Sequence, residues 1–195
     1  MIYDKNLIKI ENCSDEQVVP IKDFVWFNVY ADVVNKLDRF GMIFWVSAGT
    51  ALGFYRDKKV ISEDTDLDFE IMMTKNSEDY ESILIKEFSK NYDVFRKMWY
   101  DKNIMQLCFK HKNTGILVDL YFFYDFENND FLINFNEHGM YRFPKKFIPK
   151  CFKGLEEFLP DFTKEYLVWR YGENWKIPIS KKDWCDQCGS ALRKW

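Results

Sequence analysis

The feature that most constrains this 195-residue chain is an alternation of acidic and apolar residues, Asp66-Leu67-Asp68-Phe69. Successive side chains of a β-strand point to opposite faces of its sheet, so Leu67 and Phe69 should enter a core while Asp66 and Asp68 project together on the other face. Two parallel carboxylates repel each other unless a cation lies between them. Hard oxygen ligands at this spacing suit Mg²⁺ or Mn²⁺. Taken alone, the four residues leave open an amphipathic strand with a solvated acidic face.

Two further features favour a metal site over a solvated face. Asp119 interrupts an otherwise apolar strand, where a carboxylate must be paired, protonated or metal-bound because burying it uncompensated is costly. Gly49-Thr50 stands at a strand-to-helix turn, where a glycine lets the backbone approach a phosphate and the N–H groups of a helix start bind anions. The order of strand, Gly-Thr, helix, Asp-x-Asp and a distant strand Asp resembles the arrangement of site residues in the nucleotidyltransferase fold.

The pattern of the whole chain predicts an α+β protein with a mixed β-sheet flanked by helices. An apolar face recurs from Trp26 to Phe40, and Gly41 ends that helix. A small-residue turn at 48–50 should precede a short helix at 51–56. A further helix should be capped by Asn76 or Ser77. Strands are expected at 43–47, 66–72, 92–99, 104–111, 115–124, 131–135 and 141–143, and a late helix at 161–171.

No domain break is visible in the sequence. We therefore expect a single domain over residues 1–195, with a catalytic core at about 20–125 and a C-terminal helical extension at about 145–195. The net charge of −3 argues against bulk binding to nucleic acid. The chain shows neither a signal-peptide pattern nor an apolar run of transmembrane length, and its five cysteines are an odd number, so we expect a reduced, cytoplasmic protein.

Two other clusters of residues could have either a structural role or a function in binding. Cys185-x-x-Cys188 is half of a possible zinc site, but zinc needs four ligands and no second close pair exists. Lysines and phenylalanines alternate in the stretch that contains Lys145, Lys146, Phe147, Lys150, Phe152 and Lys153. Such a run usually forms a solvated face of the protein. The functional alternative is that these lysines line a cleft and attract the phosphates of a substrate.

Several stretches of the sequence resemble the fukutin and LicD family. The first match contains Trp45, Gly49, Thr50, Leu52, Gly53 and Arg56, followed by Asp64, Asp66 and Asp68. Later matches lie at 143–150 and in the segment that contains Tyr166, Leu167, Arg170, Tyr171, Gly172, Trp175 and Pro178. The residues of the first match resemble those of fukutin more closely than those of bacterial LicD proteins. Thr65 stands where many LicD-like members have another Asp.

The resemblance implies transfer of a phospho-alcohol, of the phosphocholine or alditol phosphate type, from a CDP-activated donor to a sugar hydroxyl of a surface glycan precursor. It implies that Asp66, Asp68 and Asp119 hold Mg²⁺ or Mn²⁺ and that one of them, with Asp119 favoured, accepts the proton of the hydroxyl. Donor binding would fall to Gly49, Thr50 and the Arg56 clamp, while Asp64 would orient a metal ligand or a substrate hydroxyl.

Two rival functions stay open at this point. A nucleotidyltransferase would place a nucleotide on a small sugar or alcohol and release pyrophosphate rather than CMP. A non-catalytic member of the fold would bind a glycan or a nucleotide without turnover, although the presence of all three aspartates argues against it. The donor alcohol, the acceptor and the oligomeric state are not determined by the sequence.

Overall fold

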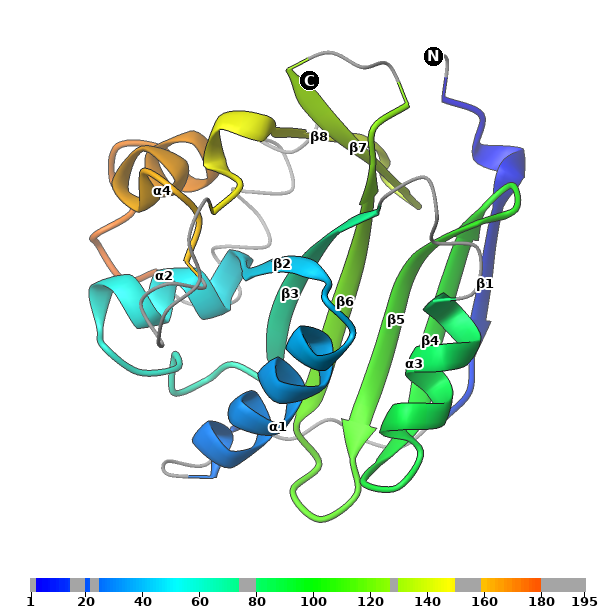
Figure 1. Cartoon of the computed structure of the whole chain (residues 1–195). Coiled ribbons are helices and arrows are strands. Elements are labelled where there is room, and N and C mark those ends of the chain that lie inside the picture. The colour runs from blue at the N-terminus through cyan, green and yellow to red at the C-terminus, as the bar shows by residue number, and fades with distance from the viewer. Residues whose placement is uncertain are drawn as a thin grey trace.

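The computed structural model describes residues 3–14, 20–21, 25–73, 80–126, 130–149 and 159–179. These residues form an eight-stranded sheet in the order β1-β4-β5-β6-β3-β2, with β7 pairing with β6 and β8 pairing with β7 (Figure 1). The strands are β1 (Ile8–Asn12), β2 (Ile43–Val46), β3 (Asp66–Met73), β4 (Tyr92–Tyr100), β5 (Asn103–His111), β6 (Leu117–Tyr124), β7 (Phe131–Asn136) and β8 (Gly139–Pro144). The helices are α1 (Trp26–Arg39), α2 (Ala48–Arg56), α3 (Tyr80–Phe88) and α4 (Thr163–Tyr171), with short 3-10 turns at Lys5–Leu7 and Lys145–Phe147. The α+β class with a mixed sheet is therefore confirmed.

One face of the sheet is covered by α1 and α3, which both lie in front of it in Figure 1. Leu67, on β3, is fully buried on this face. The Tyr30 ring of α1 stacks on Phe69 of β3 at a centroid distance of 5.8 Å, and Phe88 of α3 stacks on Phe109 of β5 at 4.6 Å. Since side chains alternate along each strand, the carboxylates of β3 and β6 are left on the opposite face.

The parallel ladder between β3 and β6 positions the site. Asp68 pairs in register with Asp119, and the ladder extends from Asp66 to Met73. The other strand pairs of the described sheet are antiparallel. This single parallel pair brings together two segments that are about fifty residues apart in the sequence.

One local expectation was wrong, and one strand was not predicted. The predicted turn at 48–50 is instead the first turn of α2, because the Ala51 N–H already donates to the Ser47 carbonyl at 2.8 Å. The Ala48 N–H donates to the Tyr166 hydroxyl at 3.0 Å, so a residue distant in sequence holds this helix start. Strand β1 was not predicted: it has five residues, and its pairing with β4, rather than a strong local pattern, makes it a strand.

The remaining elements lie close to their predicted ranges. Helix α1 ends as expected, with Gly41 at a φ of +63° just beyond it. The predicted cap at Asn76 or Ser77 lies outside the described residues, as do Lys150, Phe152, Lys153 and the Cys185/Cys188 pair. Within the basic-aromatic stretch, Phe147 is a core residue, while Lys145 forms an ion pair with Asp125 at 2.6 Å.

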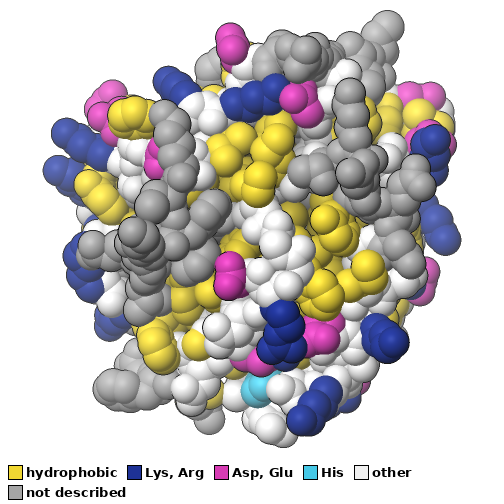
Figure 2. Space-filling model, viewed as in Figure 1, with side chains coloured by type: hydrophobic (Ala, Val, Ile, Leu, Met, Phe, Trp, Pro, Cys, Tyr) yellow, Lys and Arg dark blue, Asp and Glu magenta, His cyan; other side chains and the backbone are white. Residues whose placement is uncertain are grey.

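The face seen in Figure 2 mixes acidic and basic side chains with exposed hydrophobic ones. None of the helices in the described ranges is long and apolar enough to cross a lipid bilayer.

Candidate active site

Three carboxylates converge on the sheet face opposite α1 and α3. Asp66 and Asp68 come from β3 and Asp119 from the adjacent β6, and one oxygen of each lies within 4.8 Å of the others. Asp68 and Asp119 are buried, at 7% and 6% exposure, while Asp66 is half-buried. Two ligands of one Mg²⁺ lie at most about 4.2 Å apart. Small side-chain rotations would therefore let the three oxygens share one cation, and this hard donor set fits Mg²⁺ or Mn²⁺.

The electrostatics of the three acids also favour a cation. Burial raises the pKa of Asp68 well above its usual range, and the charges of Asp66, Asp64 and Asp119 add to the effect. Burial, followed by the charge of Asp66, raises the pKa of Asp119 to about 7, although hydrogen bonds from Cys108 and Gln106 oppose the rise. A divalent cation between these oxygens would offset the repulsion and restore the charged forms.

Gly49 and Thr50 lie at the start of α2, beside the three acids. The Thr50 hydroxyl accepts the Asp68 N–H at 2.8 Å, and the Ser47 N–H donates to the Asp68 carbonyl at 3.0 Å. A Cβ on Gly49 would lie 2.5 Å from Asp64 Oδ2 and 3.8 Å from Asp68 Oδ2. Thr50 therefore positions Asp68, and Gly49 leaves the space that the Asp64 carboxylate occupies.

Asp64 lies beside Gly49 at the start of α2, and Arg56 lies at the other end of the same helix. The Asp64 carbonyl accepts the Ile21 N–H at 2.8 Å, and its carboxylate acts electrostatically on Asp68. Arg56, the last residue of α2, forms a two-pronged pair with Asp57, with its Nε and Nη2 donating at 2.8 Å and 2.7 Å. A donor phosphate would therefore have to compete with the Asp57 carboxylate for the Arg56 guanidinium.

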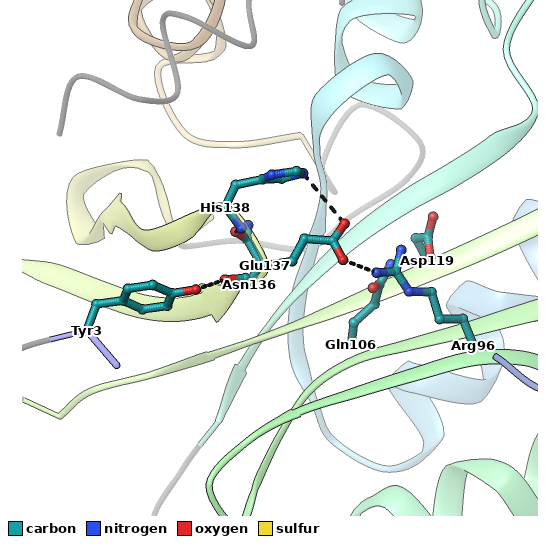
Figure 3. Close-up of polar contacts among 7 residues, drawn as sticks. All are labelled: Tyr3, Arg96, Gln106, Asp119, Asn136, Glu137 and His138. Atoms are coloured by element: carbon teal, nitrogen blue, oxygen red, sulfur yellow. Dashed lines mark hydrogen bonds and ion pairs between the residues drawn. The ribbon is translucent and has the colours of Figure 1, made fainter. Parts of the chain in front are cut away.

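Sequence reasoning missed two polar residues of β5 that contact Asp119. Gln106 is buried, and its Nε2 donates to Asp119 Oδ1 at 2.8 Å (Figure 3). Cys108, also buried, pairs with Asp119 in register and donates a hydrogen bond to it. Gln106 interrupts an apolar strand in the same way as Asp119, so the signal that identified Asp119 was present for Gln106 too, whereas Cys108 gave no such signal.

A second group that was missed links the acidic strand to α4. Glu70 continues the Asp66-Asp68 alternation and is 2% exposed. It accepts Trp45 Nε1–H at 2.7 Å and lies 3.5 Å from Nη1 of Arg170, which also donates to the Tyr141 hydroxyl. Burial raises the pKa of Glu70, while Arg170 and the Trp45 hydrogen bond oppose the rise. Helix α4 therefore places a largely buried cation beside Glu70, and the charge of this cation also acts on Asp68.

The two α2 glycines should respond differently to substitution by alanine. In Gly53→Ala the new Cβ would lie 2.6 Å from the Lys59 carbonyl oxygen, which is backbone, so we expect a loss of about 1–3 kcal/mol in the free energy of unfolding. In Gly49→Ala the obstacle is the end of the Asp64 side chain, which can move. We expect stability within about 1 kcal/mol of wild type, but turnover about 10- to 100-fold lower. Chemical denaturation and a turnover assay test both; unchanged turnover in Gly49→Ala would contradict the role given to Asp64.

The metal-free protein should lose stability as pH rises from about 4 to 7. Asp119 holds its proton in the folded state up to a pKa of about 7 but releases it near 3.8 when unfolded, so unfolding releases a proton in this window. Mg²⁺ at 100 times its dissociation constant should add about 2.7 kcal/mol above pH 7 and much less at pH 5. Denaturation of wild type and Asp119→Asn at each pH isolates this contribution. A pH-independent difference between the two proteins would contradict it.

Comparisons with known proteins assign the chain to a protein family. Residues 41–154 match the family described as LicD/FKTN/FKRP, nucleotidyltransferase domain, and the chain belongs to this family. The structure resembles the lincomycin-bound lincosamide antibiotic adenylyltransferase LnuA with a TM-score of 0.51 and 13% identity, covering 90% of this chain and 99% of that one. The nucleotidyltransferase fold expected from the sequence is thereby confirmed.

Among curated proteins, the chain is similar to ribitol-5-phosphate transferase FKTN. It is 32% identical over 164 residues to the proteins from Homo sapiens and Macaca fascicularis, a match that covers 79% of this chain and 33% of each of those. The Mus musculus protein is 32% identical over 160 residues, with 77% and 33% covered. The chain thus spans about a third of the length of these relatives, and the likeness to fukutin noted from the sequence is confirmed.

Proposed function

We propose that this chain is a Mg²⁺-dependent phosphotransferase that moves a phospho-alcohol from a CDP-activated donor to a sugar hydroxyl of a surface glycan precursor. The observation that carries the proposal is the convergence of Asp66, Asp68 and Asp119 in a chain whose relatives are named ribitol-5-phosphate transferases. CDP-ribitol is therefore the first donor to test.

The reaction can be written from the residues of this site. The acceptor hydroxyl oxygen forms a bond to the phosphorus that carries the alcohol, the bond from that phosphorus to the CMP oxygen breaks, and the hydroxyl proton passes to a carboxylate. Asp66, Asp68 and Asp119 would hold Mg²⁺, which supplies charge stabilisation at the transferred phosphoryl group when bound. Gln106 orients Asp119 through its hydrogen bond to Oδ1. The Gly49 and Thr50 N–H groups, in the first turn of α2, would face the donor phosphates.

The experiment measures binding and product together. Purified protein is titrated with CDP-ribitol, CDP-choline and CTP, with Mg²⁺ or with EDTA, and nucleotide products are separated in the presence of sugar acceptors. We expect Mg²⁺-dependent binding of one CDP-alcohol and release of CMP. Release of pyrophosphate from CTP would instead indicate a nucleotidyltransferase. Binding that never leads to turnover would indicate a non-catalytic module.

Asp119→Asn separates the two roles available to this carboxylate. Turnover should fall by about 100-fold or more in either case, since proton transfer and metal placement each contribute at least that much. If Asp119 is only the base, Mg²⁺-dependent binding of CDP-ribitol should persist, whereas a metal ligand should lose it. Isothermal titration with and without Mg²⁺ makes the distinction, and wild-type turnover in Asp119→Asn would remove Asp119 from the reaction.

A further inference from the structure

A basic residue ends a row of side chains that starts in the acidic cluster. Asp68, Asp119, Cys108 and Arg96 are successive register partners on β3, β6, β5 and β4. Register partners in a sheet project to the same face, and neighbouring strands lie about 4.8 Å apart. The Arg96 backbone is therefore about 10 Å from that of Asp119, on the same face of the sheet. Arg96 also acts electrostatically on the Cys108 thiol, which contacts Asp119.

The Arg96 guanidinium is held from the side of the β7–β8 hairpin. Its Nη2 donates to Glu137 Oε2 at 2.6 Å, and Glu137 lies in the turn of that hairpin, where His138 is also near it (Figure 3). Arg96 Nε is buried and has no hydrogen-bond acceptor among the described residues. The Glu137 side chain is 37% exposed, so it is a partner at the surface rather than in the core. The described residues therefore accept only part of the hydrogen bonds that the Arg96 guanidinium can donate.

Two other arginines of the described residues also have acidic partners. Arg170 is paired with Glu70 and Tyr141, and Arg56 with Asp57, both on the side of α2 and α4. Arg96 approaches from the opposite side, across β5. A planar guanidinium binds two phosphate oxygens at once, and the diphosphate of a CDP-alcohol carries two negative charges against the single charge of Glu137.

We propose that Arg96 is a substrate-binding residue that contacts a phosphoryl group of the donor on the side of the acidic cluster away from Gly49. In the free protein the Arg96 guanidinium is paired with Glu137, and this ion pair breaks when the phosphoryl group binds. This inference rests on the proposed function, because it assumes that a phosphorylated substrate is bound at Asp66, Asp68 and Asp119. It adds one basic residue, on β4, to a site otherwise built on β3, β6 and α2.

Two substitutions test it, because the proposal predicts opposite effects. Arg96→Gln should raise the dissociation constant for CDP-ribitol with Mg²⁺ by about 10- to 100-fold, as expected for a lost charged hydrogen bond. Glu137→Gln removes the competitor and should lower it several-fold. If the ion pair were only structural, either substitution would break it, and the dissociation constant for CDP-ribitol should change in the same direction in both variants. Equal or absent changes would overturn the proposal.

A matched control and a simpler probe complete the test. Arg39→Gln breaks a comparable pair, Arg39 with Glu87 at 3.0 Å, on the face that carries α1 and α3, and should leave binding unchanged. Pyrophosphate with Mg²⁺ is titrated in parallel. If CDP-ribitol is not bound but pyrophosphate shows the opposite effects of the two variants, the donor assignment fails and the Arg96 proposal stands. If CDP-ribitol is turned over and neither variant changes its binding, the proposed function stands and the Arg96 proposal fails.

Discussion

Asp68→Asn should lower turnover by about 100-fold or more while leaving the fold intact. A bound metal contributes several kcal/mol of charge stabilisation to phosphoryl transfer, and each 1.36 kcal/mol is tenfold in rate. The substitution keeps the size of the side chain and removes one charge from three crowded carboxylates. Because burial and the neighbouring acids raise the pKa of Asp68, the metal-free variant should be as stable as wild type or more stable. Turnover and chemical denaturation measure the two effects.

A matched control for Asp68→Asn is Asp93→Asn. Asp93 lies on β4, is largely exposed and forms a loose pair with Lys112 at 3.6 Å, so its loss should alter neither rate nor stability by a measurable amount. If Asp68→Asn transfers at the wild-type rate, the three acids hold no metal that the reaction needs and the enzyme assignment fails. If it unfolds instead, Asp68 is structural and its raised pKa does not reflect a metal site.

The largest stability effect should come from Arg170→Met. This change leaves Glu70 buried, at 2% exposure, without its cation, and removes a donor to Tyr141. Removing one partner of a buried pair typically costs about 3–5 kcal/mol, because the remaining charge is left uncompensated. We expect a loss of that size in the free energy of unfolding, measured by urea denaturation.

The double variant Glu70→Gln with Arg170→Met separates charge from packing. If the cost is the unpaired Glu70, the double variant should recover part of the stability that Arg170→Met loses. The exposed pair of Arg39 and Glu87 provides the comparison, since Arg39→Gln should cost less than about 1 kcal/mol. A loss below 1 kcal/mol in Arg170→Met would show that Glu70 is simply protonated and needs no cation.

The core of the site was predictable because its signal is local. The alternation at Asp66-Leu67-Asp68-Phe69 determines which side chains face away from the helices, and Asp119 is conspicuous in an apolar strand. The strands and helices that carry these residues also follow from apolar periodicity. What the local pattern could not supply was that β3 and β6 are neighbours, which the resemblance to a known site plan provided.

The residues that were missed depend on contacts between distant segments. Arg170 reads as a polar position on a late helix, and only the packing of α4 beside β3 reveals that it faces Glu70. Arg96 reads as a surface position on β4, and its relation to Asp119 follows from two strand registers. The same holds for the start of α2, where Tyr166 holds a helix turn that the small residues at 48–50 predict as a loop.

The parallel ladder between β3 and β6 has a consequence for how this protein folds. Parallel pairing of distant segments requires closing a long loop, here residues 74–116, before its contacts contribute any stability, so such a ladder tends to form late. Asp68 and Asp119 become neighbours only when this step is complete. A cation that bridges them would therefore bind the assembled sheet and stabilise it relative to states in which β3 and β6 have not yet paired.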